Sequence, residues 1–312
     1  MKKTALAIIF FLLIGDFSFG QEVDNKVPMY GEIPKSEYHE KLDKEFIKDV
    51  VKKYGSKKEA CEAHVDFGWR YYYNKDGVTS MKRFNQAWLL NPDNPDIYFG
   101  FAALTEAKGN QKEADRLYRI GLDKDVKKER AEICYKKIAD CKEQNEDYNG
   151  TINAYLKIIE LNDKNTFAYK KLGYFYSFTS DSIKSEMYLT RAIELDPKDE
   201  LTYNNRGHLY HKEKAYQKAI DDYSKAIMIN PKYISAYVNR GLSKTELGDI
   251  EGAKNDFQIS SDLDPKSPEL KKYLGFAKLT LKDIDGACAD FKEALKLGDT
   301  HAEQWIKEIN CT

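Results

Sequence analysis

Few residues of this chain have types and spacings suited to chemistry, and the closest pair is His208 and His211, one helical turn apart. Two imidazoles on one helix face would supply part of a zinc site, which needs three or four ligands. No cysteine or carboxylate at a suitable spacing completes the set. We therefore expect two histidines that face solvent, with neither a metal nor a cofactor.

Catalysis would require a nucleophile, a base or a metal held in a pocket. The sequence has no GxxxxGK[ST] loop, GxGxxG turn or GxSxG elbow, which are the usual signs of nucleotide binding and acyl transfer. Its five cysteines show no CxxC or Cys/His pattern. Cys134 and Cys141, seven residues apart on one predicted helix, are separated by about 10 Å, too far for a disulfide. We expect a protein without enzymatic activity.

A repeat of 34 residues organises the sequence. This shift places Tyr203 on Tyr237, Gly207 on Gly241, Ala219 on Ala253, Tyr223 on Phe257 and Pro231 on Pro265. With Tyr203 counted as position 4, small residues fall at positions 8, 20 and 27, rings at 4, 11 and 24, and proline at 32. The pattern predicts two helices that approach closely at their small residues, the second helix ending at the proline.

This pattern resembles the tetratricopeptide repeat, whose Trp/Tyr, Leu, Gly, Tyr, Ala, Phe/Tyr, Ala and Pro have the same spacings. Seven copies follow in almost unbroken register, at residues 61–94, 95–131, 132–165, 166–199, 200–233, 234–267 and 268–301. The resemblance implies an all-α fold, a right-handed superhelical solenoid of stacked helix-turn-helix units with a cap at each end.

The flanks of the repeats supply candidate caps. Residues 21–60 contain an extended segment followed by an amphipathic helix over about 36–54, which either covers the first repeat or lies in the groove of the solenoid. Residues 300–312 predict a short amphipathic helix in which Thr300 and Glu303 form a capping box ahead of Trp305.

Residues 1–20 have the features of a cleaved secretory signal, namely two lysines, a short apolar run and small residues before a cut after Gly20. No lipid-accepting cysteine follows the cut and no second hydrophobic segment occurs, so we expect a secreted or periplasmic chain without a membrane span. The net charge of −1 does not favour binding to nucleic acid. The segments VPMYGEIP and MKRFNQAWLLNP are similar to those of exported bacterial tetratricopeptide proteins.

The resemblance also implies a concave groove lined by positions 2, 5, 6, 9, 12 and 13 of each first helix. The residues expected there are Trp69, Tyr72, Tyr73, Phe99, Lys136, Lys137, Lys170, Lys171, Tyr174, Asn205, His208 and Asn239. Aromatic anchors followed by mixed charge suit an extended peptide. Burial of Trp69 and Tyr72 under the helix of residues 36–54 stays open, as does a purely solvated role for the lysines.

Some members of this family hold a terminal carboxylate with five Lys, Asn and Arg positions, of which only Lys170 and Asn205 match here. A carboxylate clamp is therefore not expected.

Cys288 occupies position 21 of the seventh copy and Cys311 position 10 of a would-be eighth copy, two sites that face each other across stacked helices. A disulfide between them and free thiols both stay open.

The leading hypothesis is a non-enzymatic scaffold of the bacterial cell envelope that binds a protein or peptide in the groove. The alternative is an envelope glycan binder that uses Trp69, Tyr72 and Tyr73 as stacking platforms. Tetratricopeptide scaffolds differ mainly in their surface residues, so the sequence does not identify the partner.

Overall fold

The computed structural model describes residues 26–32, 35–125, 128–179 and 181–311. The predicted signal peptide of residues 1–20 lies outside them. The chain divides into two compact units, residues 1–162 and 163–312, and each unit is described by itself. Throughout the described residues the regular elements are helices, so the predicted all-α class is confirmed.

The first unit contains one 3₁₀ helix, one leading α-helix and three helical hairpins. Its elements are η1 (Pro28–Glu32), α2 (Glu37–Tyr54), α3 (Lys57–Tyr73), α4 (Gly77–Leu90), α5 (Pro95–Ala107), α6 (Gln111–Lys124), α7 (Glu129–Gln144) and α8 (Tyr148–Leu161). The hairpins pair α3 with α4, α5 with α6 and α7 with α8. Each pair matches one predicted repeat in order along the chain.

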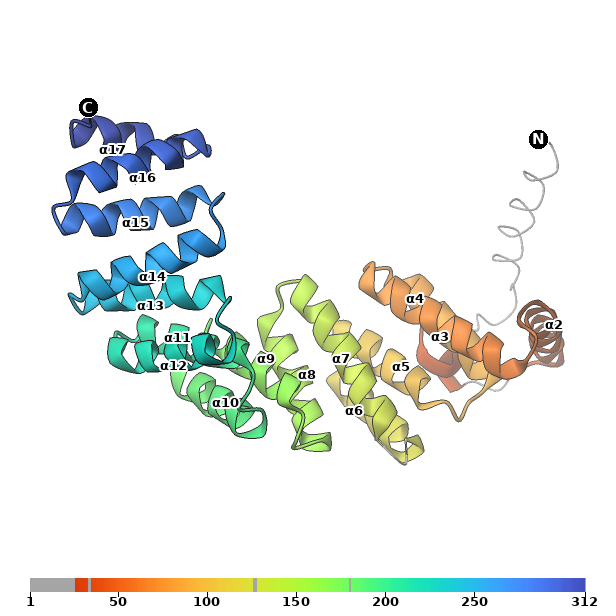
Figure 1. Cartoon of the computed structure of the whole chain (residues 1–312). Helices are drawn as coiled ribbons and strands as arrows, with labels where there is room; N and C mark the ends of the chain where they lie inside the picture. Colours follow the sequence, from red (N-terminus) through yellow and green to blue (C-terminus); the bar gives the residue numbers. More distant parts are fainter. Residues whose placement is uncertain (1–25, 33–34, 126–127, 180, 312) are drawn as a thin grey trace, which may run out of the picture. The chain divides into compact units, whose positions relative to one another are not determined.

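The second unit contains four hairpins and a final short helix. Its elements are α9 (Thr166–Tyr176), α10 (Ser182–Leu195), α11 (Glu200–Lys212), α12 (Tyr216–Ile229), α13 (Ile234–Glu246), α14 (Ile250–Leu263), α15 (Pro268–Thr280), α16 (Ile284–Lys296) and α17 (Ala302–Glu308). Figure 1 shows α11 to α17 following one another as a stack of helices in this unit. Each hairpin packs on the next, through α10 on α11, α12 on α13 and α14 on α15.

The turn inside the hairpin is built the same way in the first and the seventh repeats. Position 15 takes a left-handed backbone, as in Lys75 with φ 60° and Lys282 with φ 65°. The next residue caps the second helix: Asp76 accepts from the backbone N–H of Thr79, and Asp283 accepts from that of Gly286. This reversal followed by a side-chain cap starts the second helix four residues after the first one ends.

The seam within each hairpin places a ring against a glycine. A Cβ atom on Gly207 would lie 2.7 Å from Cε1 of Tyr223, closer than real contacts allow. Tyr223, Ala219 and Ala226 are fully or almost fully buried. The small residues at positions 8, 20 and 27 therefore set the helix separation, as the repeat pattern predicts.

The helix α5 is enclosed more completely than any first helix of the second unit. Every residue from Asp96 to Thr105 is buried, including Phe99 and Phe101 with no exposed surface. The cover comes from α3, α4, α6 and also α7, which contacts both α5 and α3. Successive first helices of this unit thus pack directly on one another.

The two ends carry additional helices. At the start of the chain, α2 packs on α3 and places Phe46 and Tyr54 edge-on against His64. At the other end, α17 packs on α16, and Trp305 contacts the rings of Phe276 and Phe291. Both helices cover a face of the neighbouring hairpin.

The capping box expected at Thr300 and Glu303 is wrong. The helix α17 begins at Ala302, and the residue before it makes no side-chain cap. Asp299 organises this end instead, because its carboxylate accepts from the N–H of His301 and its carbonyl accepts from the N–H of Ala302. The turn that precedes the helix therefore satisfies two backbone donors at the start of α17, those of His301 and Ala302.

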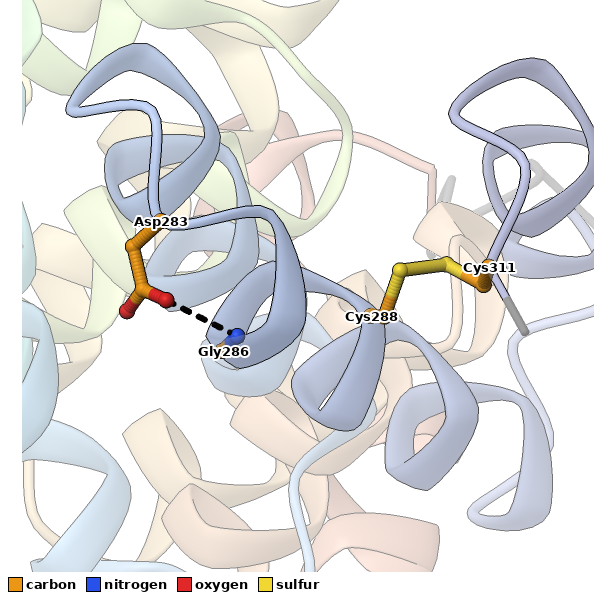
Figure 2. The surroundings of a disulfide bond; sticks show 4 residues. All are labelled: Asp283, Gly286, Cys288 and Cys311. Atoms are coloured by element: carbon orange, nitrogen blue, oxygen red, sulfur yellow. Dashed lines mark hydrogen bonds between the residues drawn. A yellow bond between two sulfur atoms is a disulfide. The ribbon is translucent and has the colours of Figure 1, made fainter.

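A disulfide joins Cys288 on α16 to Cys311 just beyond α17, with 5.6 Å between their Cα atoms. Figure 2 shows it bridging the two segments, with the Asp283 cap of α16 nearby. The structure thus resolves the sequence alternatives in favour of the bonded form. Cys61, Cys134 and Cys141 are buried free thiols.

Candidate partner-binding surfaces

The first helices of the second unit present one side chain each at position 9 of the repeat. These side chains are Tyr174, His208, Leu242 and Phe276, at intervals of 34 residues. Tyr174 is 41% exposed, Phe276 is 39% exposed and His208 is exposed, whereas Leu242 is half-buried. We call this set the position-9 row.

An aromatic pair forms the beginning of this row. Tyr174 and Phe178 contact each other edge-to-face, with ring centroids 4.8 Å apart and planes at 77°. Phe178 is 58% exposed, although it is apolar. Phe167, at the start of α9, is also 41% exposed. Exposed rings held by neighbouring rings are typical anchors for a protein partner, since they lose little conformational entropy on binding.

Polar side chains next to the row are already tied together. Asn239 on α13 donates to Asn204 on α11 at 3.0 Å, and His211 Nδ1 lies 2.8 Å from Ser243 Oγ. Asn205 is half-buried on the same helix as Asn204. These bonds connect adjacent first helices, so Asn239 contributes to stacking as well as to the surface.

His208 is the titratable member of the row. Its pKa lies below the ordinary histidine value, chiefly because protein atoms displace water around the ring, and also because of the nearby charges of His211 and Lys212. The ring is therefore mostly neutral at neutral pH and can donate or accept a hydrogen bond. The part of the chain that the structure describes contains no group of three potential metal ligands, and His208 and His211 remain a pair.

The lysines of the fourth repeat are engaged within the unit. Lys170 lies 3.1 Å from the carboxylate of Asp199. The ammonium of Lys171 lies 5.6 Å from the ring centroid of Phe175 and 5.9 Å from that of Phe167. Both lysines are half-buried. Their charges are partly neutralised or shielded, so they favour orientation of a partner more than its affinity.

The Asn-Arg-Gly runs of repeats five and six have a structural role. Arg206 donates to both carboxylate oxygens of Asp222, at 2.8 and 2.9 Å, and a third bond at 3.0 Å reaches Thr190 of the preceding hairpin. Arg240 repeats this with Asp256 and Ser224. Each arginine thus holds its own hairpin together and fastens it to the one before.

The expectation that Trp69, Tyr72 and Phe99 line an open groove is wrong. Their side chains are 2%, 7% and 0% exposed. Trp69 packs on Phe84, and Phe99 packs on Tyr135 of α7. The cause is α7, which lies against α3 and α5 and covers the face that was expected to bind a partner.

Burial of Trp69 and Tyr72 was the alternative left open by the sequence, but the cover differs from the one considered there. Lys137 of α7 places its ammonium 5.4 Å from the Trp69 ring, and the Cys141 thiol lies near the carbonyl of Tyr72. The half-buried Tyr73 donates to the carbonyl of Lys137 at 3.0 Å. Lys136 is exposed and pairs with Asp140 one turn on.

Several surface residues were overlooked by the sequence analysis, chiefly Phe167 and Phe276. Both occupy positions that the family uses for its groove, position 2 and position 9, so extending the register to these copies would have found them.

Among the described residues, no helix is both long and apolar enough to span a membrane.

Comparison with known protein families identifies two of the repeats. Two models described as "Tetratricopeptide repeat" match residues 168–199 and 201–233. These segments contain α9 with α10 and α11 with α12. No curated protein matches the chain.

Solved structures give the same result over longer spans. The C-terminal part of a TPR repeat-containing protein from Cytophaga hutchinsonii is 15% identical, with a TM-score of 0.57, and the match covers 77% of this chain and 98% of that one. A crystal structure of MamA is 26% identical, with a TM-score of 0.50 over 55% of this chain and 94% of that one. MamA from Desulfovibrio magneticus RS-1 is 17% identical, with a TM-score of 0.51 over 54% and 97%. The predicted solenoid fold is confirmed.

Proposed function

Because the chain is a tetratricopeptide-repeat protein, we propose that it is a non-enzymatic scaffold of the bacterial cell envelope that binds a protein or peptide across the position-9 row. Repeats of this kind are interaction scaffolds in general, and their stacked helices offer a long surface rather than a reactive pocket. The observation that carries the proposal is the exposed aromatic pair Tyr174 and Phe178.

The partner contacts follow from the surface that remains accessible. Tyr174 and Phe178 would anchor an apolar segment of the partner, and His208 and Asn205 would bond to its backbone or polar side chains. Lys170, Lys171 and Asn239 would set its orientation. Trp69, Tyr72 and Phe99 do not take part in these contacts because they are buried.

The envelope location rests on two observations. The sequence of residues 1–20 has the features of an export signal. The disulfide between Cys288 and Cys311 supports the same location, because disulfides persist in oxidising compartments and are rare in the reducing cytosol. N-terminal sequencing of the protein from whole cells tests export: a chain that begins at Gln21 supports it, and a chain that retains residues 1–20 overturns it.

The binding surface is tested by site-specific photocrosslinking in the native envelope. A photoreactive amino acid at Phe178 should crosslink a protein partner that mass spectrometry can identify. The matched control is the same amino acid at Ile183, which is 81% exposed but lies on α10, the second helix of the hairpin. Equal products at both positions, or none at Phe178, would place the contact elsewhere.

Affinity for the identified partner provides the second test. Tyr174→Ala and Phe178→Ala should each weaken binding by roughly thirtyfold, equivalent to about 2 kcal/mol. Met228→Ala serves as a control, since Met228 is 71% exposed on α12. The glycan alternative loses two of its stacking platforms with the burial of Trp69 and Tyr72, and binding of soluble cell-wall fragments without any crosslinked protein would revive it.

A further inference from the structure

A short segment at the start of the described chain, residues 26–32, lies against the first unit and is here named the strap. Its helix η1 packs on α4. Lys108 donates to the carbonyl of Lys26 at 2.6 Å, and Asn85 donates to the carbonyl of Val27 at 3.0 Å. Two side chains of the repeats therefore donate hydrogen bonds to backbone carbonyls of the strap, as side chains do when they bind a peptide.

Asn85 of the first repeat differs in type and in bonding from the residues at the same position of repeats four and five. It stands at position 25, where repeats four and five have Thr190 and Ser224. Those hydroxyls accept from the arginine at position 7 of the following repeat. Position 7 of the second repeat is Phe101, which has no donor, and the amide of Asn85 bonds to the strap instead. Asn85 is completely buried, so water does not compete for this bond.

Two side chains of the strap contribute to its contacts with the repeats. Met29, on the helix that packs on α4, is 7% exposed. Three residues later, Glu32 accepts from Arg116 of α6 at 2.8 Å. Arg116 is held in place by Glu113, and the two carboxylates raise its pKa and keep it charged. The cleft thus combines a site for an apolar side chain with a fixed positive charge.

The strap fills the cleft incompletely. A cavity of about 630 Å³ remains between the strap and the repeats, lined among others by Met81, Thr105, Asn110 and Arg116. Met29 and Glu32 both have left-handed backbones, with φ of 50° and 56°. Non-glycine residues adopt this conformation uncommonly and mostly where the chain turns sharply. The strap therefore turns sharply twice, and the cleft beside it has room for more than the strap itself.

We propose that the cleft formed by α4, α5 and α6 is a second peptide-binding site, which the strap occupies in cis and which a segment of a partner protein occupies in trans. The ligand is a short segment that can adopt the turned conformation of the strap, with accessible backbone carbonyls, a long unbranched apolar side chain and a carboxylate three residues further on. The charge of Arg116 and the chemistry of the strap both select this occupant. The site is separate from the position-9 row and does not depend on it.

The test uses the chain of residues 21–312 and a fluorescently labelled peptide of residues 24–35, DNKVPMYGEIPK. Met29→Asp combined with Glu32→Lys releases the strap. The released variant should bind the peptide in fluorescence anisotropy, and the unmodified chain should bind it at least tenfold more weakly, because the tethered strap competes at a high effective concentration. A labelled peptide with the same two changes should not bind.

Variants in the released background identify the site. Asn85→Asp replaces the donating amide with a carboxylate and should reduce binding at least tenfold, as should Arg116→Ala. Gln258→Glu makes the same chemical change at position 25 of repeat six and should leave binding unchanged, as should Tyr174→Ala. Circular dichroism must show that each variant is folded.

A library of random twelve-residue peptides defines the ligand. Selection on the released variant should enrich Met or Leu followed three residues later by Asp or Glu, and selection on the unmodified chain should not. The proposal fails if the folded released variant binds neither peptide 24–35 nor such sequences. It also fails if Asn85→Asp has no effect, or if light scattering shows a dimer in which two copies exchange straps.

Discussion

The guanidinium group of Arg240 holds the carboxylate of Asp256 through two parallel hydrogen bonds, of 2.9 Å from Nε and 2.7 Å from Nη2. The carboxylate is 2% exposed and also lies 2.9 Å from the ammonium of Lys244. One acidic group on α14 therefore pairs with two cations of α13.

Removal of this carboxylate should strongly destabilise the second unit. Asp256→Ala leaves Arg240 and Lys244 partly buried without their counter-charge, and breaking a buried pair on one side costs about 3–5 kcal/mol in free energy of unfolding. Urea denaturation followed by circular dichroism measures this loss. Asp262→Ala, on the exposed part of the same helix, should change stability by less than about 0.5 kcal/mol. Equal effects would contradict a special role for the buried pair.

Trp69→Ala should lower stability and leave partner binding intact. The indole is buried against Tyr72 and Phe84, so its loss creates a cavity. Such a cavity lowers the free energy of unfolding by about 3–5 kcal/mol. Melting temperature and affinity for the partner, measured on the same variant, separate packing from recognition. A large fall in affinity with an unchanged melting temperature would show that Trp69 contacts the partner and that the binding surface lies on the first unit.

Acidification should loosen the first unit through His64. Its Nδ1 lies 2.7 Å from the carbonyl of Ala60, and burial lowers its pKa below 6.5, helped by the charges of Arg83 and Lys53. A lowered pKa in the folded state means that the unfolded chain binds the proton more tightly. The contribution of His64 to stability is thus complete above about pH 6.5 and falls as the pH drops below that value.

His64→Gln should reduce this dependence. Free energies of unfolding measured at several pH values between about 7 and 5 should fall less steeply for the variant than for the unmodified chain. The glutamine can still donate to the Ala60 carbonyl, so folding is preserved. Identical slopes would show that His64 does not titrate during unfolding.

Loss of the disulfide should release α17. Cys311→Ser opens a loop whose ends are 23 residues apart, which costs roughly 3 kcal/mol by chain entropy. Hydrogen exchange should increase in α17, and Trp305 fluorescence should shift to longer wavelength as the ring leaves Phe276 and Phe291. A chain isolated from its native compartment with five reactive thiols would contradict the bond.

The sequence pattern predicted the packing inside each hairpin well. The seam residues Gly207, Tyr210, Ala219, Tyr223 and Ala226 are all buried. This success has a physical cause, because a ring can approach a helix closely only opposite a small residue. Spacing along the chain is sufficient to find such pairs.

The packing between hairpins was harder to predict. Phe99 stands at a position that the family exposes, yet α7 buries it. How closely one hairpin packs on another depends on the volumes of side chains that are far apart in the sequence. A 34-residue period contains no information on these volumes. The contacts of residues 26–32 were missed for the same reason, since Asn85 and Val27 are 58 residues apart.

The arginine bonds that connect hairpins also bear on how the second unit melts. In a one-dimensional description of repeat proteins, stability is the sum of the intrinsic terms of the repeats and the coupling between neighbours. Bonds from Arg206 to Thr190 and from Arg240 to Ser224 add to the coupling terms. Strong coupling makes partly unfolded arrays rare, so calorimetry of this unit should show one cooperative transition rather than gradual fraying from an end.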